Sequence, residues 1–377
     1  MPGPVRRPTV KDVAAEAGVA VMTVSYTFNH PTRVAEATRA KVLEAARRLG
    51  YRRPDATARA LRSGRNGQIG VVVGEHLSYA FEDPQAALFL AGVADVCVES
   101  GTGIVLIPTH GDPAPGGAST SRTSTPSDMV EDVERVLAAP VDGYVLWTTT
   151  TDDPVLAAIA DSGRPAAIQG GPAHPGITLV GLDDHAAAAA VATALLTTAP
   201  AAPFPPAKTS PHAVVPVVLS FPLDHDRQPQ VLQGRDLPPD LSTVRFPVTA
   251  NRLAGYRQAL TAHGYRWEDT LIAVSGRNRR VDGRTAATAL LDRVDDRAPL
   301  LILAMSDELA LGALDVLTAA GRTARLTGWD ATPAAQAAGI TSVTNPLREQ
   351  GRRCARAVLH VPADDAADDP AWEITTA

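Results

Sequence analysis

Five side chains between residues 21 and 26 combine hydroxyl and apolar groups in a way that suits contact with a nucleic acid. They are Val21, Met22, Thr23, Ser25 and Tyr26. Hydroxyl groups can donate to phosphate oxygens and base edges, and apolar side chains can contact the methyl group of thymine. A short helix that presents such a set to solvent can enter the major groove of DNA. These residue types predict a DNA-reading surface if the surrounding sequence builds that helix.

Residues 10–29 have the pattern of a helix–turn–helix that would hold this surface. Apolar residues recur at helical spacing as far as Ala17, and Gly18 then interrupts them where a tight turn tolerates positive φ. A second helix would bury Val24 and Phe28 and leave the reading residues outside. An ordinary helical hairpin in a protein core has the same apolar pattern, so the neighbouring sequence must decide between the two.

The distribution of charge favours DNA binding over a buried hairpin. Residues 1–67 hold 13 Lys and Arg against 5 Asp and Glu, a net charge of +8, whereas residues 68–377 carry −14. A basic head on an acidic body suits a head that meets phosphates and a body that does not. Residues 35–49 predict a third helix over the hairpin, with Gly50 as its C-cap.

The composition excludes several other classes of protein. The two cysteines, Cys97 and Cys354, belong to no CxxC or Cys/His cluster, so neither a metal site nor a disulfide framework is expected. The start of the chain has no apolar signal segment, and no apolar run reaches the roughly 20 residues of a membrane helix. We expect a cytoplasmic protein with no membrane partner and no cofactor.

The body alternates predicted strands with predicted helices, which indicates parallel, doubly wound sheets. After residue 198 the alternation restarts, so two Rossmann-like lobes with a ligand cleft between them are expected. Residues 198–216, rich in Pro and Ala, predict an irregular surface loop. The strands of the first set are expected at 68–74, 103–108, 142–147, 165–170 and 177–183, and those of the second at 217–220, 271–275, 300–306 and 326–330.

These segments together resemble the lactose-repressor (LacI/GalR) family of transcription regulators over nearly the whole chain. The family headpiece is similar to TVKDVAAEAGVAVMTVSYTFN, its third helix to RVAEATRAKVLEAARRLGYRRP, and its hinge with the first body strand to ATARALRSGRNGQIGVVV. Body motifs match, in the expected order, NRLAGYRQAL, AMSDELALGAL, LTGWDATP and ITSVTNPLREQGRRCARAVL. A variant common in actinobacterial members looks like LSYAFEDPQAALFLAGVA.

The resemblance implies an N-terminal all-α helix–turn–helix headpiece and an α/β periplasmic-binding-protein-like body of two doubly wound parallel-sheet lobes. The headpiece would span residues 1–53, a hinge helix or linker 54–67, and the effector-binding and dimerisation domain 68–377. Lobe 1 would comprise about 68–182 and 346–360, and lobe 2 about 183–345. A plain basic linker is the alternative to a hinge helix.

For DNA contact, the resemblance places Val21, Met22 and Tyr26 at base edges. Tyr26 stands where many members have Arg, which predicts an atypical operator. Further contacts are expected from Thr23, Ser25, Asn29 and Arg33, which would position the protein on phosphates. In the hinge, Leu61 matches the family's minor-groove wedge and Ala58 a minor-groove residue. Ala20 and Ala35 stand where the family usually has a capping Ser or Thr.

For the effector, the resemblance points to a site between the lobes that usually takes a sugar. Arg252 matches the Arg that grips ligand hydroxyls, and Asp330 matches the ligand-binding Asp. Ser306 replaces the usual Asn, and Ala331 replaces a second Asp. The remaining expected effector-binding residues are Trp329, Asn278, Gln169, Tyr79 and Phe81.

Other functions fit the sequence less well. The enzyme motifs GxSxG, HExxH, P-loop and GxGxxG do not occur, so no catalytic residues are expected. A sugar-binding transport protein would have no need of a DNA-binding head. The prediction is a homodimeric transcriptional repressor that binds a pseudo-palindromic operator under control of a small ligand, expected to be a sugar. A family member that has lost ligand binding, and a corepressor in place of an inducer, stay open.

Overall fold

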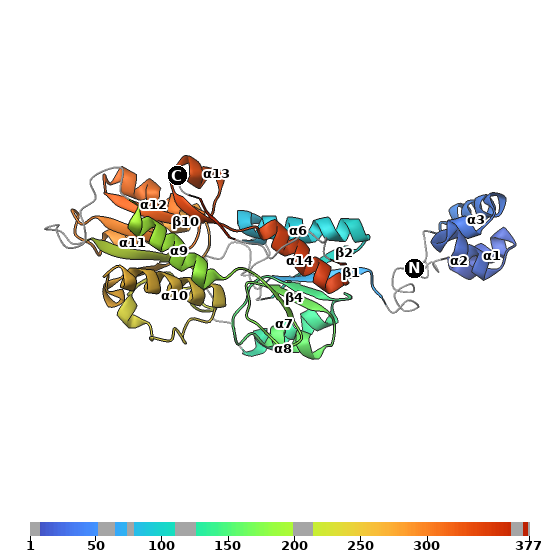
Figure 1. Ribbon diagram of the computed structural model, residues 1–377. Coiled ribbons are helices and arrows are strands. Elements are labelled where there is room, and N and C mark those ends of the chain that lie inside the picture. Colours follow the sequence, from blue (N-terminus) through green and yellow to red (C-terminus); the bar gives the residue numbers. More distant parts are fainter. Residues whose placement is uncertain are drawn as a thin grey trace, which may run out of the picture. The chain divides into compact units, whose positions relative to one another are not determined.

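The computed structural model describes residues 8–51, 65–73, 79–109, 126–198, 214–362 and 372–375. The chain divides into two compact units, Met1–Gly67 and Gln68–Ala377. The first is helical and the second is an α/β body with two parallel-sheet lobes, so the predicted fold class is confirmed (Figure 1). Within the described ranges, no helix combines the length and apolar character needed to cross a membrane.

The N-terminal unit contains the predicted helix–turn–helix and its covering helix. Its helices are α1 (Val10–Ala17), α2 (Val21–Asn29) and α3 (Glu36–Leu49), with a short 3-10 turn η1 (Pro31–Arg33). The Thr9 hydroxyl accepts from the Asp12 N–H and the Asp12 carboxylate accepts from the Thr9 N–H, so the two residues form a capping box at the start of α1. Gly18 ends α1 at φ +61°, so the turn uses the conformation that glycine favours.

Five parallel strands form the first sheet of the body, in the order β2-β1-β3-β4-β5. The strands are β1 (Gln68–Val73), β2 (Gly103–Pro108), β3 (Tyr144–Leu146), β4 (Ala166–Gln169) and β5 (Thr178–Val180). All five fall within the ranges expected from the sequence. The inner strands β1, β3 and β4 are almost entirely buried, because helices cover both faces of the sheet there, whereas the edge strands β2 and β5 leave Ile104 and Leu179 exposed.

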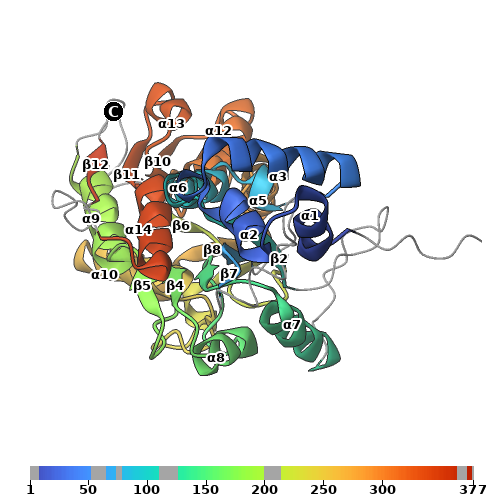
Figure 2. The ribbon, with the colours of Figure 1, turned by 90° about the vertical axis from the view of Figure 1, so that its right-hand side faces the viewer.

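Two pairs of helices cover the first sheet. One face packs against α6 (Pro84–Ser100), preceded by the short α5 (Tyr79–Glu82), and against α14 (Leu347–Leu359). The other face packs against α7 (Pro126–Ala138) and α8 (Pro154–Asp161). A Cβ at Gly92 of α6 would lie 1.8 Å from the Arg348 carbonyl oxygen, so glycine lets α6 and α14 cross closely (Figure 2).

The second sheet has seven strands in the order β12-β11-β10-β9-β6-β8-β7. The five central strands are parallel, whereas the short edge strands β7 and β12 are antiparallel, which the sequence did not predict. The strands are β6 (Val215–Ser220), β7 (Gln230–Gln233), β8 (Leu271–Val274), β9 (Leu300–Ala304), β10 (Ala324–Asp330), β11 (Thr341–Thr344) and β12 (Ile374–Thr375). Strand β6 begins two residues before the strand predicted at 217–220, within the segment 198–216 that the sequence predicted to be a loop. Residues 199–213 of that segment lie outside the described ranges.

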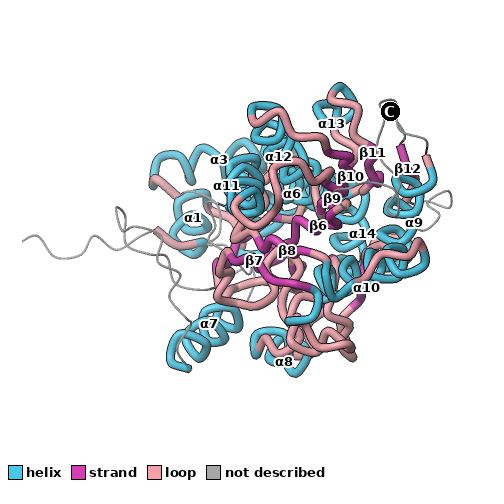
Figure 3. The backbone as a smooth tube through the Cα atoms, turned by 90° about the vertical axis from the view of Figure 1, so that its left-hand side faces the viewer, coloured by secondary structure: helices cyan, strands magenta, loops and turns pink. Residues whose placement is uncertain are grey.

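Helices cover both faces of this sheet as well (Figure 3). One face packs against α9 (Asp184–Thr197) and α10 (Pro247–Ala262), the other against α11 (Arg280–Leu291), α12 (Asp307–Ala319) and α13 (Pro333–Ala337). Two 3-10 turns, η2 (Gly234–Asp236) and η3 (Trp267–Asp269), complete the lobe. The chain passes from the first lobe to the second between β5 and α9, and returns between β11 and α14.

Candidate functional site

The structure exposes the predicted DNA-reading residues of α2. The exposed fractions of Val21, Met22 and Tyr26 are 45%, 61% and 37%, whereas Val24 is fully buried against α1 and α3. Exposing two large apolar side chains beside each other costs hydration free energy, so such a pair on a basic unit indicates a contact surface. The same helix thus separates a packing face from the predicted reading face, which comprises the exposed Val21, Met22 and Tyr26.

The other predicted DNA contacts surround this face where the structure describes them. Thr23 and Ser25 are half-buried on α2, and Arg33 is exposed in η1. Thr27 turns inward and donates from its hydroxyl to the Thr23 carbonyl oxygen at 2.9 Å. The α2 N-cap, Ala20, makes no side-chain cap bond. The side chain of Asn29, and the hinge residues Ala58 and Leu61, lie outside the described residues.

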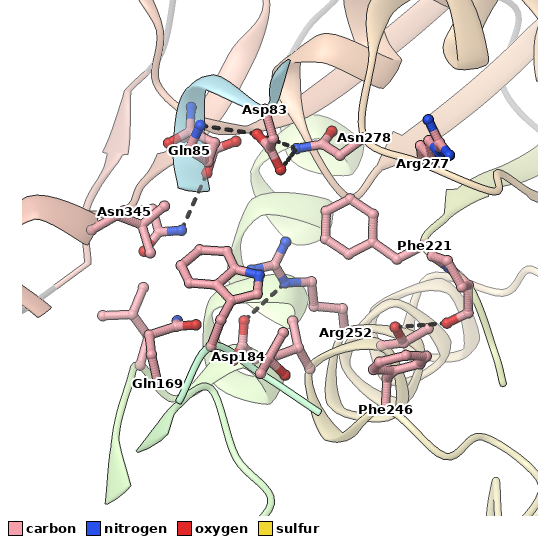
Figure 4. Close-up of a pocket in the computed structure, with 18 of the residues that line it drawn as sticks. Asp83, Gln85, Gln169, Asp184, Phe221, Phe246, Arg252, Arg277, Asn278 and Asn345 are labelled. Atoms are coloured by element: carbon pink, nitrogen blue, oxygen red, sulfur yellow. Dashed lines mark hydrogen bonds and ion pairs between the residues drawn. The ribbon is translucent and has the colours of Figure 1, made fainter. Parts of the chain in front are cut away.

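A pocket of about 100 Å³ opens between the two lobes, where the carboxyl ends of the parallel strands meet (Figure 4). Ligands of open α/β sheets bind at such strand ends. Residues from both lobes line it: Asp83, Gln85, Trp147, Thr148, Gln169, Leu182, Asp184, Phe221, Pro222, Arg227, Phe246, Val248, Thr249, Arg252, Arg277, Asn278, Asp330, Asn345 and Leu347. Of the predicted effector-binding residues, the pocket brings together Arg252, Asp330, Asn278 and Gln169.

Arg252 of α10 lies at the centre of the pocket's polar lining and is only 5% exposed. Its Nε donates to Asp184 at 2.8 Å, and its Nη1 donates to the Met305 carbonyl oxygen at 2.6 Å. The guanidinium also stacks 3.6 Å from the ring centroid of Trp329. Burial raises the pKa of Asp184 and the Arg252 charge opposes that rise. These contacts fix the guanidinium plane toward the pocket and leave Nη2 without an acceptor among the described residues.

Asp330 ends β10 in a strained backbone conformation. Its φ is +107° and that of the next residue, Ala331, is +48°, which side chains with a Cβ rarely adopt. Such strain persists only where neighbours hold it, and it concentrates at ligand sites. Burial raises the pKa of Asp330 well above its ordinary value. The positive charge of Arg252 opposes this rise, and the negative charge of Asp307 adds to it.

Buried groups beneath Asp330 hold that turn. Asp307, fully buried at the start of α12, accepts from the Thr332 N–H at 2.6 Å and from the Ser342 hydroxyl at 2.7 Å. The Ser342 oxygen in turn accepts from the Ala331 N–H at 3.0 Å. The two N–H groups that follow Asp330 are therefore both fixed, and the position of its carboxylate with them.

Direct hydrogen bonds join the lobes at the rim of the pocket. Asn278 of lobe 2 donates to the Asp83 carboxylate of lobe 1 at 3.3 Å and accepts from the Ser306 hydroxyl at 2.5 Å. At another point the Thr150 hydroxyl lies 2.7 Å from Nε2 of His225. These contacts hold the lobes together around the pocket.

An amide relay crosses the other side of the pocket. Gln169 donates to Gln350 at 3.0 Å, Gln350 donates to Asn345 at 2.9 Å, and Asn345 donates to Asp330 at 3.2 Å. The relay connects the end of β4 in lobe 1 with the end of β10 in lobe 2. A ligand that displaces one of these bonds would therefore act on both lobes.

Four of the predicted effector-binding residues are not part of this lining. Trp329 is fully buried in the core, because it faces the underside of Arg252 rather than the pocket. Ser306 is also fully buried, since its hydroxyl caps α12 and contacts Asn278. Phe81 is 65% exposed outside the lining. The side chain of Tyr79 lies outside the described residues.

Sequence reasoning missed the aromatic and acidic side chains that do line the pocket. Trp147 ends the β3 region, and Phe221 directly follows β6. Asp184, the partner of Arg252, is also absent from the residues predicted from the sequence. Their positions just after parallel strands were the available signal, because every strand end of a doubly wound sheet points to the same edge. Among the described residues, no three His, Cys, Asp or Glu side chains gather as a metal site requires.

Comparison with known proteins gives matches to both units. Residues 9–54 match the model of bacterial regulatory proteins of the lacI family, and residues 240–376 match that of a periplasmic binding protein-like domain. The HTH-type transcriptional regulator Rv3575c of Mycobacterium tuberculosis is 32% identical over 366 residues, covering 96% of this chain and 93% of that protein. This relative is named as a regulator and not as an enzyme.

Two solved structures illustrate the similarity of fold. The complex of the transcriptional regulator CelR with cellobiose has 24% identity and a TM-score of 0.57, covering 98% of this chain and 99% of that one. The lac repressor dimer bound to operator and the anti-inducer ONPF has 19% identity and a TM-score of 0.65, covering 94% and 93%. At these identities the likeness shows the fold alone.

Proposed function

The chain belongs to the lacI family of bacterial regulatory proteins and is a DNA-binding transcriptional regulator, and we propose that it is a homodimeric repressor controlled by a small polar ligand. The observation that carries the DNA-binding half of this proposal is the reading face of α2. Its exposed Val21, Met22 and Tyr26 lie on a unit whose sequence is strongly basic. Major-groove readers combine such a face with a phosphate-binding surround.

The dimer is proposed from the fold shared with the lac repressor, which binds its operator as a dimer. Two headpieces related by a two-fold axis would read a pseudo-palindromic site. The hinge, residues 54–67, would place Leu61 and Ala58 in the central minor groove. Tyr26 offers one hydroxyl and a ring in place of a bidentate guanidinium, so an operator unlike those of Arg-containing members is expected.

Control by a ligand is proposed from the pocket between the lobes. CelR, with a similar fold, is solved with cellobiose in complex. Arg252, Asp330, Gln169 and Asn278 supply donors and acceptors from several strand ends, as the hydroxyls of a sugar require. We propose a sugar or related polyol as effector and no cofactor.

The mechanism would be linkage between the pocket and the hinge. A ligand that binds one arrangement of the lobes more tightly shifts the population toward it, and DNA affinity changes by the same free energy. An inducer would favour the arrangement with melted hinge helices, and a corepressor the other. Both outcomes need a ligand that binds the two arrangements with different affinities, and contacts to both lobes can provide that difference.

The first experiment is selection of the purified protein against random double-stranded DNA at a stated salt concentration. We expect enrichment of a palindrome with a flexible pyrimidine–purine step at its centre. Non-specific, salt-sensitive binding alone, both with and without added sugars, would contradict the proposal. Repeating the selection with sugars distinguishes a corepressor, which enriches the palindrome, from an inducer, which reduces it.

A further inference from the structure

His30 is the only histidine in the sequence of the basic N-terminal unit, residues 1–67. Histidine is the side chain that ordinarily gains a positive charge between pH 8 and pH 5. Carboxylates, tyrosine, lysine and arginine ordinarily titrate outside that range, and residues 1–67 contain no cysteine. The side-chain charge of this unit is therefore expected to change near neutral pH at one position alone.

The His30 side chain lies beside Tyr26, which belongs to the predicted reading face of α2. His30 is the C-cap of that helix, and its N–H donates to the Tyr26 carbonyl oxygen at 2.8 Å. The centroids of the two rings lie 6.1 Å apart with an interplanar angle of 65°, which is an edge-to-face contact. Both side chains are exposed. The imidazole therefore restricts the orientations of the Tyr26 ring and extends the surface that carries it.

His30 has no carboxylate partner among the described residues. Three elements pack against α2, namely α1, η1 and α3. In the described structure His30 forms no ion pair with any of their charged side chains, which are Lys11, Asp12, Glu16, Arg33, Glu36, Arg39, Lys41, Glu44, Arg47 and Arg48. The carboxylates of Glu16 and Glu44 each lie 3.5 Å from Arg48 instead. A protonated His30 thus keeps its charge for a partner outside this unit.

The partner that suits this position is a phosphate of DNA. Base edges are read by the side chains that a helix points into the groove, and most other contacts of a DNA-binding unit go to phosphate oxygens. An imidazolium N–H donates a charge-assisted hydrogen bond to phosphate, which is stronger than the bond from a neutral imidazole. A phosphate contact at His30 would therefore couple DNA binding to the uptake of a proton.

We propose that His30 is a DNA-contacting residue whose imidazolium donates to a backbone phosphate while its ring positions Tyr26 at the base edges, so that DNA affinity rises as pH falls from 8 to 6. This inference rests on the proposed reading face of α2. It adds a residue that is absent from the contacts predicted from the sequence, and it adds a dependence of operator binding on pH.

The test is His30→Gln, which keeps a polar side chain and removes the protonation. Fluorescence anisotropy measures the affinity of the full-length protein for a duplex that carries the selected palindrome, at pH 6, 7 and 8 and at fixed salt. For the wild type we expect an affinity at pH 6 that exceeds the affinity at pH 8 by roughly threefold or more for each bound protomer, as for an exposed ion pair. His30→Gln should lose this difference.

His263→Gln is the matched control. His263 is also the exposed C-cap of a helix, α10, but it belongs to the α/β body. This variant should keep the pH dependence of the wild type. The dependence of affinity on salt is a second readout, because at pH 6 the slope for the wild type should exceed that for His30→Gln by about 1 for each bound protomer. Thermal unfolding at each pH checks that both variants are folded.

A Tyr26→Ala background separates the phosphate contact from the positioning of the ring. There His30→Gln should still abolish the pH effect, because the phosphate contact does not need the Tyr26 ring. It should cause no further loss of sequence preference, because the ring that His30 positions is absent. A further loss of preference in that background would contradict the positioning of Tyr26 by His30.

Two results would overturn the phosphate contact: a wild-type affinity that does not change between pH 6 and pH 8, and a pH effect that persists in His30→Gln. A phosphate contact is independent of sequence, so a duplex of scrambled sequence should show the same pH effect. If the selection enriches no palindrome and the scrambled duplex still shows a pH effect that requires His30, the proposed sequence-specific operator fails and the phosphate contact stands.

Discussion

The face of α2 proposed to read DNA and the pocket proposed to bind the effector hold their side chains in opposite ways. On α2, Val21, Met22 and Tyr26 are neighbours in the sequence, and each is exposed. In the pocket, Arg252 and Asp330 come from distant segments and are held by other polar groups, Arg252 by the buried Asp184 and Asp330 by the half-buried Asn345.

This difference teaches where function and stability are coupled. An exposed reading residue contributes little to folding, so its substitution is expected to change recognition alone. A buried polar residue with fixed partners leaves those partners unsatisfied when it is replaced. Seven substitutions, one of them a control, test that contrast.

The largest effect is expected for Arg252→Ala. It leaves Asp184 buried without its partner, which should lower the free energy of unfolding of the body by about 3–5 kcal/mol. Urea unfolding measures this loss, and thermal shift should show no response to polyols. Operator affinity of the folded protein should persist. A variant with wild-type stability would mean that Asp184 is protonated or has another hydrogen-bond donor. It would contradict the expectation that buried polar residues of the pocket are coupled to folding stability.

Leu61→Gly tests the hinge that would link the two regions. If Leu61 wedges into the minor groove, operator affinity should fall at least tenfold, about 1.4 kcal/mol, while the ligand response of the body is retained. Fluorescence anisotropy at fixed salt measures the first quantity and thermal shift the second. Unchanged operator affinity would refute the assignment of Leu61.

Tyr26→Ala and Arg33→Ala separate reading from positioning. Loss of a base contact at Tyr26 should cost about 1–3 kcal/mol for the selected operator and relax its sequence preference. Loss of a phosphate contact at Arg33 should weaken all sequences alike and reduce the salt slope by about 1. Both side chains are exposed, so neither substitution should measurably change the melting temperature of the protein. Equal effects of Tyr26→Ala on specific and random DNA would contradict its place at a base edge.

The same contrast explains what the sequence could predict. Residues 10–49 are local: the Thr9 cap, the Gly18 turn and the buried Val24 are each determined by neighbours along the chain, so the three helices were predicted almost to the residue. The pocket is not local. Asp184 and Trp147 became recognisable only once the strand ends were placed beside Arg252. Trp329 lies outside the pocket lining and stacks on Arg252, because a strand residue has two faces and the sequence does not say which is covered.

The pH dependence of the body should report on Asp330. Its pKa is raised in the folded state, so its contribution to stability is present at low pH and is lost as pH rises from about 3.8 through the folded pKa. Asp330 contributes at most about 1.4 kcal/mol per pH unit to the slope there, and Asp330→Asn should remove that contribution, whereas the contributions of Asp184 and Asp307, whose pKa values burial also raises, should stay. Because hydroxyl donors stabilise the carboxylate, polyol affinity should rise with pH across the same window. Urea unfolding and thermal shift at several pH values measure both.

The smallest effect is expected for Ala20→Ser, which adds a capping hydroxyl to the helical unit, whereas the preceding substitutions remove an interaction. Ala20 precedes α2 in extended conformation and makes no side-chain cap bond, so a serine hydroxyl there can accept from a free N–H of the first turn. We expect about 0.5–1 kcal/mol of added stability in urea unfolding of the helical unit. Ala35→Ser, at the equally uncapped start of α3, is the matched control for a cap that is distant from the reading face. If both variants gain stability and neither changes the selected operator sequence, recognition on α2 is independent of its folding energetics. A changed operator preference in Ala20→Ser alone would show that the first turn of α2 is coupled to recognition as tightly as Arg252 is coupled to its pocket.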